Sequence, residues 1–307
     1  MIEKNHPPIK YGKTGVLIIN LGTPDSTSWF DIRKYLREFL SDRRVIEVNP
    51  IIWQIILNLF ILNFRPSKTA KAYKEIWMND KNMSPLLYYT QKQAEKISSS
   101  FSKENIVIDF AMRYGNPSIN SKIHKLHKMG CENLVILPLY PQYAAATTAT
   151  VCDEVYRTLM KMRWQPSLKI IPHYESDPLY IDALVNSINK KINEISWKPD
   201  LIIASYHGIP KKYFDKGDPY HCYCHKTTRL ISEKFSSIKI KTTFQSRFGP
   251  QEWLQPYTDK TLENLPKEGV KNVLTICPGF ASDCVETLEE IQIQAKESFL
   301  NSGGENF

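Results

Sequence analysis

The chain has 307 residues, 42% hydrophobic and 23% charged, so it can bury one or two substantial cores and shows no bias toward disorder or collagen. Its formal net charge of +8 favours anionic partners, but the basic residues are dispersed, which argues against a nucleic-acid tract. The first residues, MIEKNHPPIKYGK, are polar, and the six cysteines are irregularly spaced. Reduced thiols in a cytoplasmic protein are the simplest expectation.

Apolar, β-branched runs recur along the chain, each followed by turn residues and a helix-like segment. Continuous apolar strands separated by long helical segments, such as 177–195, predict parallel sheets with helices on both faces. The runs cover 15–22, 107–114 and 133–140 in the first half and 167–174, 200–208, 240–247 and 272–280 in the second.

A faint internal repeat indicates two similar halves. FAMRYGNPSI is echoed by FQSRFGPQEW, and MGCENLVILPLYPQYA is echoed by EGVKNVLTICPGFAS. We therefore expect an α/β fold of two similar doubly wound, Rossmann-like domains, 1–155 and 156–307, with the active-site cleft between them. In such folds ligands bind outside the carboxyl ends of the strands.

The run LIIASYHGIP ends with His207 at the carboxyl end of a predicted strand. A packed core histidine is one interpretation. A proton carrier or metal ligand is favoured, because Gly208 permits a close backbone approach and Pro210 directs the exit of the chain.

The stretch FASDCVETLEEI predicts a helix that starts at Ser282 or Asp283. Asp283 and Glu286 have the spacing of a capping box, which would make Glu286 structural. Glu286 and Glu290 also share a helix face, which suits a path for a cation. Both interpretations stand on the pattern alone.

Three further segments allow two interpretations each. HCYCH (221–225) has soft metal ligands, but its crowded spacing favours a solvated loop over a metal site. Trp253 is either a core residue or a wall for a flat ligand. The apolar segment 50–64, followed by Arg65, Lys68 and Lys71, is too short to span a bilayer and is either a buried helix or an interfacial lip. NLGTPDS lacks both phosphate-loop patterns, which disfavours nucleotide binding.

Several blocks resemble the ferrochelatase family, in the family's order and over nearly the whole chain. SYHGIPxxYxxxGDPY is similar to the family signature. NLGTP, KAY…SPL (71–86), MRYGNPS, LPLYPQ, TFQSRFGxxxWLxPYTD and PGFxxDCxETLEEI resemble its other blocks. The chain looks like a member of the bacterial, protoporphyrin-using branch.

The resemblance implies a lyase that inserts Fe²⁺ into protoporphyrin IX with release of two protons, the last step of heme biosynthesis. It implies that His207 and Glu286 are the catalytic residues and the metal ligands. Asp283 and Glu290 would be supporting acidic residues, and residues 50–64 a porphyrin lip with peripheral contact to the inner membrane. The implied porphyrin-binding positions are Leu21, Tyr73, Ser84, Arg113, Tyr114 and Trp253.

The chemistry of these residue types agrees with the resemblance. Insertion removes two pyrrole protons, so a base that works near neutral pH is needed, and histidine suits that role. Fe²⁺ accepts imidazole and carboxylate ligands, and the basic balance suits a substrate that carries two propionates.

The sequence also departs from the family. Cys284 stands where some members carry a second histidine, which puts a proton relay through that position in doubt. No cysteine follows Cys284, and the block after YPQY reads AAATTAT, so we expect no [2Fe–2S] cluster and no permanently bound cofactor. The chain ends at SGGENF, earlier than the resemblance implies. We expect the protein to be a monomer.

Two rival functions are weighed beside the iron-inserting lyase. A chelatase for cobalt or nickel would share the fold but not the SYHGIP and ETLEE blocks together. A porphyrin or heme carrier would use His207 as an axial ligand and would not need Glu286.

Overall fold

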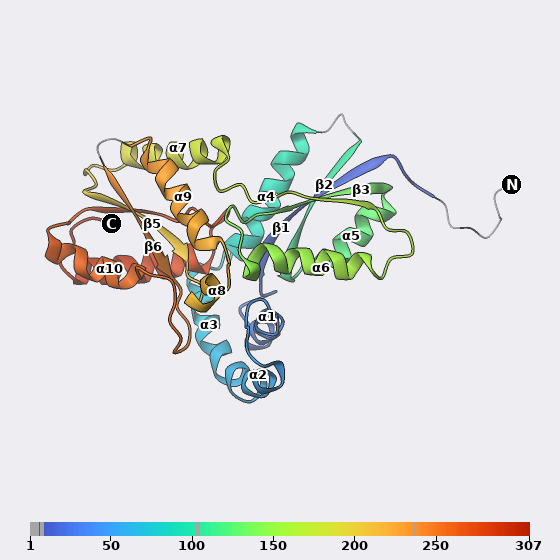
Figure 1. Ribbon diagram of the computed structural model, residues 1–307, viewed down its shortest axis with the longest axis horizontal. Helices are drawn as coiled ribbons and strands as arrows, with labels where there is room; N and C mark the ends of the chain where they lie inside the picture. Colours follow the sequence, from blue (N-terminus) through green and yellow to red (C-terminus); the bar gives the residue numbers. More distant parts are fainter. Residues whose placement is uncertain (1–5, 7–8, 102–104, 236–237) are drawn as a thin grey trace. The chain divides into compact units, whose positions relative to one another are not determined.

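The computed structural model describes residues 6, 9–101, 105–235 and 238–307 (Figure 1). The chain forms two compact units. The first comprises residues 1–71, 77–139 and 146–172, and the second comprises 72–76, 140–145 and 173–307. Each unit is built on its own parallel sheet, which confirms the expected α/β class with two Rossmann-like domains.

The first sheet has the strand order β2-β1-β3-β4. Its central strand β1 is a run of aliphatic residues, and Leu17, Ile18 and Ile19 are all fully buried because helices cover both faces. The chain leaves β1 toward β2 and then crosses back to β3, so right-handed crossovers place their helices on opposite faces. The strands are β1 (Lys13–Thr23), β2 (Ile106–Gly115), β3 (Cys131–Pro138) and β4 (Ser167–Ile170).

The second sheet repeats this plan with the order β6-β5-β7. Its strands are β5 (Leu201–His207), β6 (Lys239–Gln245) and β7 (Val273–Ile276). The central strand β5 again has its crossovers in opposite directions, so its carboxyl end is a topological switch point, where doubly wound folds bind ligands.

The internal repeat corresponds to this shared plan. β2 and β6 occupy equivalent places in the two sheets, and β3 and β7 do likewise. In both units the second strand donates one backbone hydrogen bond to the loop that follows it: Met112 N–H donates to Pro117 O at 2.8 Å, and Phe244 N–H donates to Pro256 O at 2.8 Å.

Alternating residues of β5 face two different cores. Ile203 packs with Leu262, Ile291 and Phe299 on one face of the second sheet. Tyr206 packs with Phe244 and Cys224 on the other. Because successive side chains of a strand point to opposite faces, His207 starts on the same face as Ile203.

The helices follow the predicted alternation with strands. They are α1 (Trp29–Leu40), α2 (Pro50–Ile56), α3 (Leu62–Ile76), α4 (Pro85–Ser100), α5 (Ile119–Lys128), α6 (Thr150–Leu159), α7 (Pro178–Glu194), α8 (Lys211–Asp215), α9 (Tyr220–Ser232), α10 (Thr258–Asn264) and α11 (Lys296–Asn301). α7 confirms the helix expected over 177–195. The π-helices are η1 (Leu57–Ile61), η2 (Ala145–Ala149) and η4 (Glu286–Ala295), and η3 (Leu265–Glu268) is a 3₁₀ turn.

One strand was assigned to the wrong half. The run 167–174 was expected in the second sheet, but β4 pairs in parallel with β3 at the edge of the first sheet. Only Ser167–Ile170 is strand. Apolar content identifies a strand, whereas its sheet is decided by the direction in which the preceding helix, α6, returns the chain.

Candidate active site

His207 is the last residue of β5 and pairs with Gln245, the last residue of β6. The imidazole Nδ1 lies 2.6 Å from the carbonyl oxygen of Gly208. A carbonyl oxygen can only accept a hydrogen bond, so Nδ1 carries the hydrogen. In the neutral ring the lone pair is therefore on Nε2, the nitrogen that can accept a proton or bind a metal ion.

Glu290, on η4, is bound by the residues that follow β6. Ser246 donates its backbone N–H to Oε1 at 2.7 Å and its hydroxyl to Oε2 at 2.5 Å, and the Gln245 amide donates to Oε2 at 3.4 Å. Burial raises the pKa of Glu290, and the nearby Glu286 carboxylate raises it further, while the Ser246 hydrogen bonds and His207 act in the opposite direction. His207, Glu286 and Glu290 thus form one electrostatic group.

Gln245 ties this group to the sheet. Its Oε1 accepts a hydrogen bond from the Ser205 hydroxyl at 2.6 Å, and its Nε2 donates to the backbone oxygen of Glu286 at 2.8 Å. Ser205 and His207 are two residues apart on β5 and share a face. The start of η4 is therefore attached to the strand ends that carry His207.

The helix that carries Glu286 differs from the prediction in its start and its type. η4 starts at Glu286 rather than at Ser282 or Asp283, and it is a π-helix, a form found frequently at functional sites. The capping box is wrong: no side chain caps η4, and Asp283 instead accepts a hydrogen bond from the Thr287 hydroxyl at 2.9 Å. The Glu286 side chain therefore does not cap the helix.

The two cysteines of this region are neutral thiols. Burial raises the pKa of Cys284, and the Glu286 carboxylate, which accepts a hydrogen bond from the thiol, raises it further. Burial also raises the pKa of Cys277, with contributions from Asp283 and Glu290. A neutral thiol is a poor metal ligand, so Cys277 and Cys284 are weaker candidates for metal binding than the carboxylates and the imidazole of this region.

Trp253 packs beside the exit of β5. Its indole N–H donates to the Phe248 oxygen at 2.9 Å, and a Cβ added to Gly208 would lie 3.2 Å from the indole ring and 2.9 Å from the Gln245 oxygen. Gly208 is therefore required by contacts within the protein. The chain does not leave the sheet abruptly at Gly208: its N–H donates to Gln245 O, and Leu254 N–H donates to Ile209 O.

The prediction of a solvated loop for HCYCH is wrong. The segment forms the first turns of helix α9. Tyr220 and Cys224 face the core with Tyr206 and Phe244, and this burial is the reason that the segment is helical. Among the residues that the structure describes, no group of three or more His, Cys, Asp or Glu side chains is arranged to hold a metal ion.

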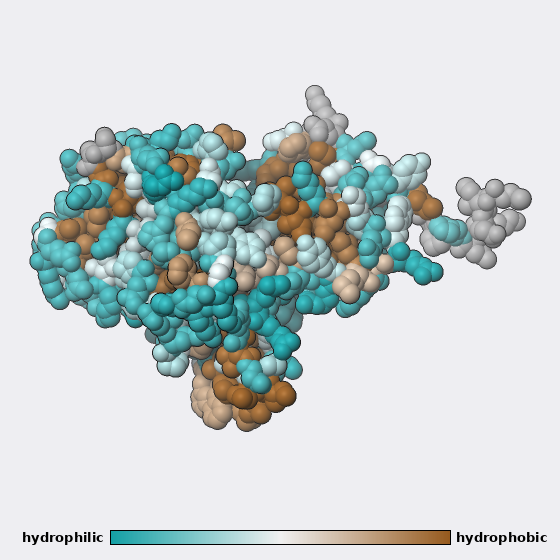
Figure 2. Space-filling model, in the orientation of Figure 1, coloured by the Kyte–Doolittle hydropathy of each residue, from teal (hydrophilic) through white to brown (hydrophobic). Residues whose placement is uncertain are grey.

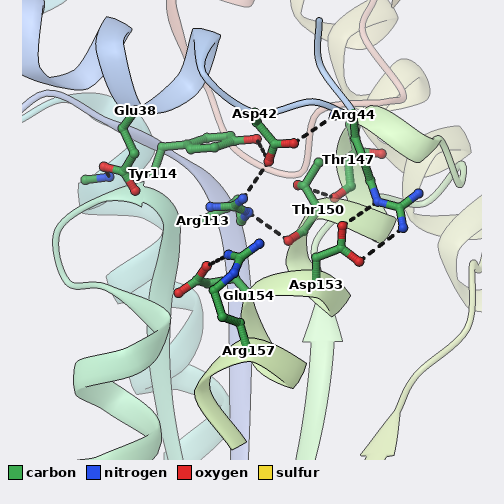
Figure 3. Close-up of polar contacts among 11 residues, drawn as sticks. Glu38, Asp42, Arg44, Arg113, Tyr114, Thr147, Thr150, Asp153, Glu154 and Arg157 are labelled. Carbon is green, nitrogen blue, oxygen red and sulfur yellow. Dashed lines mark hydrogen bonds and ion pairs between the residues drawn. The ribbon is translucent and has the colours of Figure 1, made fainter. Parts of the chain in front are cut away.

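In the first unit, Arg113 and Tyr114 both bind Asp42 (Figure 3). The Arg113 guanidinium lies 2.5 Å from the Asp42 carboxylate and also donates to the Thr150 oxygen at 2.8 Å. The Tyr114 hydroxyl donates to the same carboxylate at 2.9 Å, and its side chain is 0% exposed. Burial raises the pKa of Tyr114, so the phenol stays protonated.

The remaining predicted porphyrin positions are spread over several elements. Ser84 is buried and caps α4, because its hydroxyl accepts the Leu87 N–H at 3.2 Å. Leu21 is half-buried near the end of β1, where its N–H donates to the Asn20 side chain at 2.9 Å. Tyr73 is buried on α3.

Most side chains of the segment 50–64 are exposed or half-exposed, and only Leu57 and Leu62 are buried, which argues against a buried helix. Ile51 is 74% exposed and Phe64 is 75% exposed, and the space-filling view shows an apolar surface over α2 (Figure 2). We call Ile51, Ile52, Ile55, Leu59, Phe60 and Phe64 the apolar ridge. In the described part of the chain, no helix combines the length and the apolar character needed to cross a bilayer.

Sequence reasoning missed three residues. Asp42 binds Arg113 and Tyr114 in the first unit. Gln245 and Ser246 bind η4 at Glu286 and Glu290 in the second unit. None of the three was an expected site residue. Gln245 and Ser246 could have been found from their place at the carboxyl end of a predicted strand, directly before the RFG of the repeated block FQSRFGPQEW. Asp42 had no local signal, because its partners Arg113 and Tyr114 lie 71 and 72 residues away.

An imidazole with its lone pair on Nε2 and two neighbouring carboxylates lie at the switch point of a parallel sheet, where doubly wound α/β enzymes bind their ligands. A family model described as Ferrochelatase matches residues 13–307. The chain belongs to the ferrochelatase family, and it is therefore a lyase of heme biosynthesis that inserts iron into a porphyrin.

Curated relatives match over almost the whole chain. A ferrochelatase of Allorhizobium ampelinum is 57% identical over 309 residues, which cover 100% of this chain and 90% of that protein. A ferrochelatase of Rhizobium meliloti is 57% identical over 305 residues, covering 98% and 90%. A ferrochelatase of Brucella ovis is 52% identical over 305 residues, covering 98% and 87%. These matches favour the iron-inserting lyase over the cobalt or nickel chelatase and the carrier.

Proposed function

We propose that His207 and Glu286 carry the chemistry of insertion, with Fe²⁺ and protoporphyrin IX as substrates. The observation that supports this most directly is the hydrogen bond from His207 Nδ1 to the Gly208 oxygen, which leaves Nε2 as the basic nitrogen. Nε2 and the Glu286 carboxylate first hold the incoming ion together. As the ion passes to the porphyrin, Nε2 is released and accepts one pyrrole proton, and the Glu286 carboxylate accepts the other. Two protein ligands let the ion pass on to four porphyrin nitrogens.

Glu290 and Asp283 are proposed as supporting acids rather than as ligands. Ser246 holds Glu290 in place near His207, the residue proposed to accept a pyrrole proton. Asp283, bound by Thr287, adds negative charge before the first turn of η4. The arrangement favours both the entry of a cation and the departure of protons.

The porphyrin-facing residues are proposed in two roles. Trp253, Leu21, Ser84 and Tyr73 are proposed to shape the porphyrin site. Arg113, buried and paired with Asp42, is proposed to position the end of β2 beside the porphyrin site. Because Tyr114 is fully buried and bound to Asp42, we propose that it supports Arg113 rather than touching the ring.

We further propose that the apolar ridge rests on a membrane surface and admits the apolar porphyrin. Exposed Ile, Leu and Phe side chains on α2, on η1 and at the start of α3 suit the boundary between headgroups and acyl chains. The ridge is followed on α3 by Lys68 and Lys71, which suit anionic lipid. No resident cofactor is proposed, and iron enters only as substrate.

Metal insertion followed by porphyrin absorbance tests the site assignment. His207→Ala and Glu286→Gln are each expected to lower kcat by roughly 10²–10⁴-fold, the usual contribution of a positioned acid or base. Glu289→Gln is the matched control, because Glu289 lies on the same helix but binds Gln294 at the surface. Wild-type turnover by both His207→Ala and Glu286→Gln would refute the assignment.

A further inference from the structure

His221 and His225 lie one turn apart on α9, with ring centroids separated by 4.4 Å. Side chains at this spacing share one face of a helix, and two histidines so placed are an established arrangement for binding one zinc ion. Rings this close need only side-chain rotation to aim a nitrogen of each at a common ion.

Both imidazoles are available as ligands. The rings of His221 and His225 contact the rings of Phe214 and Phe244. Among the described residues, the structure shows no hydrogen bond to either imidazole. Partial loss of hydration at the ring lowers the pKa of His221, and the same effect together with the neighbouring His221 lowers the pKa of His225. Both rings are therefore mainly neutral at pH 7, the state that binds metal ions. His225 is exposed and His221 half-exposed, so an ion can reach them from solvent.

We propose that His221 and His225 form a second metal-binding site, for a divalent first-row transition-metal ion. Imidazole nitrogens suit zinc, copper, nickel and iron, and the last of these is the substrate ion of this enzyme. With only two protein ligands, water completes the coordination shell, so the ion exchanges readily. The site binds a metal ion reversibly at the surface and is not a structural metal centre.

The pair is separate from the active-site group. Its helix packs through Cys224 and Tyr220 on the face of the second sheet that carries Tyr206 and Phe244. His207, Gln245 and the start of η4 lie on the opposite face. The proposal therefore does not depend on the roles given to His207 and Glu286, and either can fail without the other.

Calorimetric titration with Ni²⁺ at pH 7.5 tests the proposal on the full chain. The wild-type protein is expected to bind one more equivalent of Ni²⁺ than His225→Ala and His225→Asn do. His124→Ala is the matched control, because it also removes one histidine but lies on α5 of the first unit, and it should bind as the wild type does. His225 is exposed, so both His225 variants should unfold at the wild-type temperature without metal.

A site-resolved measurement locates the ion. The chain has seven histidines, and paramagnetic Ni²⁺ should broaden the Cε1–H resonances of His221 and His225 in addition to any effect at His207. Equal Ni²⁺ stoichiometry and affinity in wild type and both His225 variants would overturn the proposal. Broadening confined to His207 would do so as well.

Discussion

Ser246 binds both carboxylate oxygens of Glu290, through its backbone N–H at 2.7 Å and its hydroxyl at 2.5 Å. Ser246 has φ of 68°, in the left-handed region that a residue with a Cβ rarely adopts. This conformation directs the amide and the hydroxyl to the same carboxylate. The backbone strain is thus associated with the contact that positions Glu290 beside His207.

Substitutions of Ser246 should separate strain from hydrogen bonding. Ser246→Ala removes the hydroxyl bond but keeps the left-handed strain, so we expect a loss of about 1.5–3 kcal/mol, the range for a hydrogen bond to a charged group. Ser246→Gly also removes the hydroxyl but adopts this φ freely, and should be less destabilising by about 1 kcal/mol. Urea unfolding measures both. A glycine variant less stable than the alanine variant would contradict this account.

Glu290 should make the protein less stable as pH rises. Its folded pKa is raised, mainly by burial, so the folded state holds a proton that the unfolded state releases. Stability is then lost between the unfolded pKa of a glutamate, about 4.3, and the higher folded pKa. Glu290→Gln cannot ionise, so its stability relative to wild type should improve across this interval. Parallel curves of unfolding free energy against pH for the two proteins would show that Glu290 does not titrate as proposed.

Asp42 should contribute far more to stability than Asp153, although each binds an arginine. The Arg113–Asp42 pair has side chains 8% and 10% exposed, whereas the Arg44–Asp153 pair has 42% and 36%. Removing one partner of a buried pair leaves an uncompensated charge, so Asp42→Asn should cost about 3–5 kcal/mol. Asp153→Asn should cost no more than about 1 kcal/mol, as for other exposed ion pairs. Chemical denaturation compares them, and equal losses would argue against a buried cluster.

The apolar ridge should control membrane binding. Phe60→Ser and Phe64→Ser should each weaken binding to anionic vesicles by roughly tenfold or more, because a fully buried apolar side chain contributes about 1.5–3 kcal/mol. Leu179→Ser is the matched control, since Leu179 is 80% exposed but lies on α7. Cosedimentation with vesicles measures the effect. If Leu179→Ser weakened binding as much as Phe64→Ser, the ridge would not be the membrane contact.

The α/β class and the place of His207 could be predicted from the sequence because both depend on local patterns. Apolar runs such as LIIAS follow the periodicity of buried parallel strands, and Gly208 and Pro210 mark where β5 ends. The same local signals could not decide which sheet receives β4. That choice depends on where α6 packs, and packing involves residues far apart in the chain.

The details of the candidate site were decided by tertiary structure. A capping spacing at Asp283 and Glu286 predicted an ordinary helix start, yet Gln245 binds the backbone of Glu286 from 41 residues away, and the helix takes the π form. The crowded spacing of HCYCH predicted a solvated loop, but the segment lies in helix α9, whose Tyr220 and Cys224 are buried in the core.

Sequence by itself therefore determined the fold class, the family and the position of His207, because strand periodicity, turn residues and short motifs are local properties. Only the tertiary structure decided that Ser246 holds Glu290, that Asp42 joins Arg113 to Tyr114, and that His221 lies against His225. The first two contacts join residues 44 or more positions apart, and the third depends on a helix that forms because its opposite face is buried.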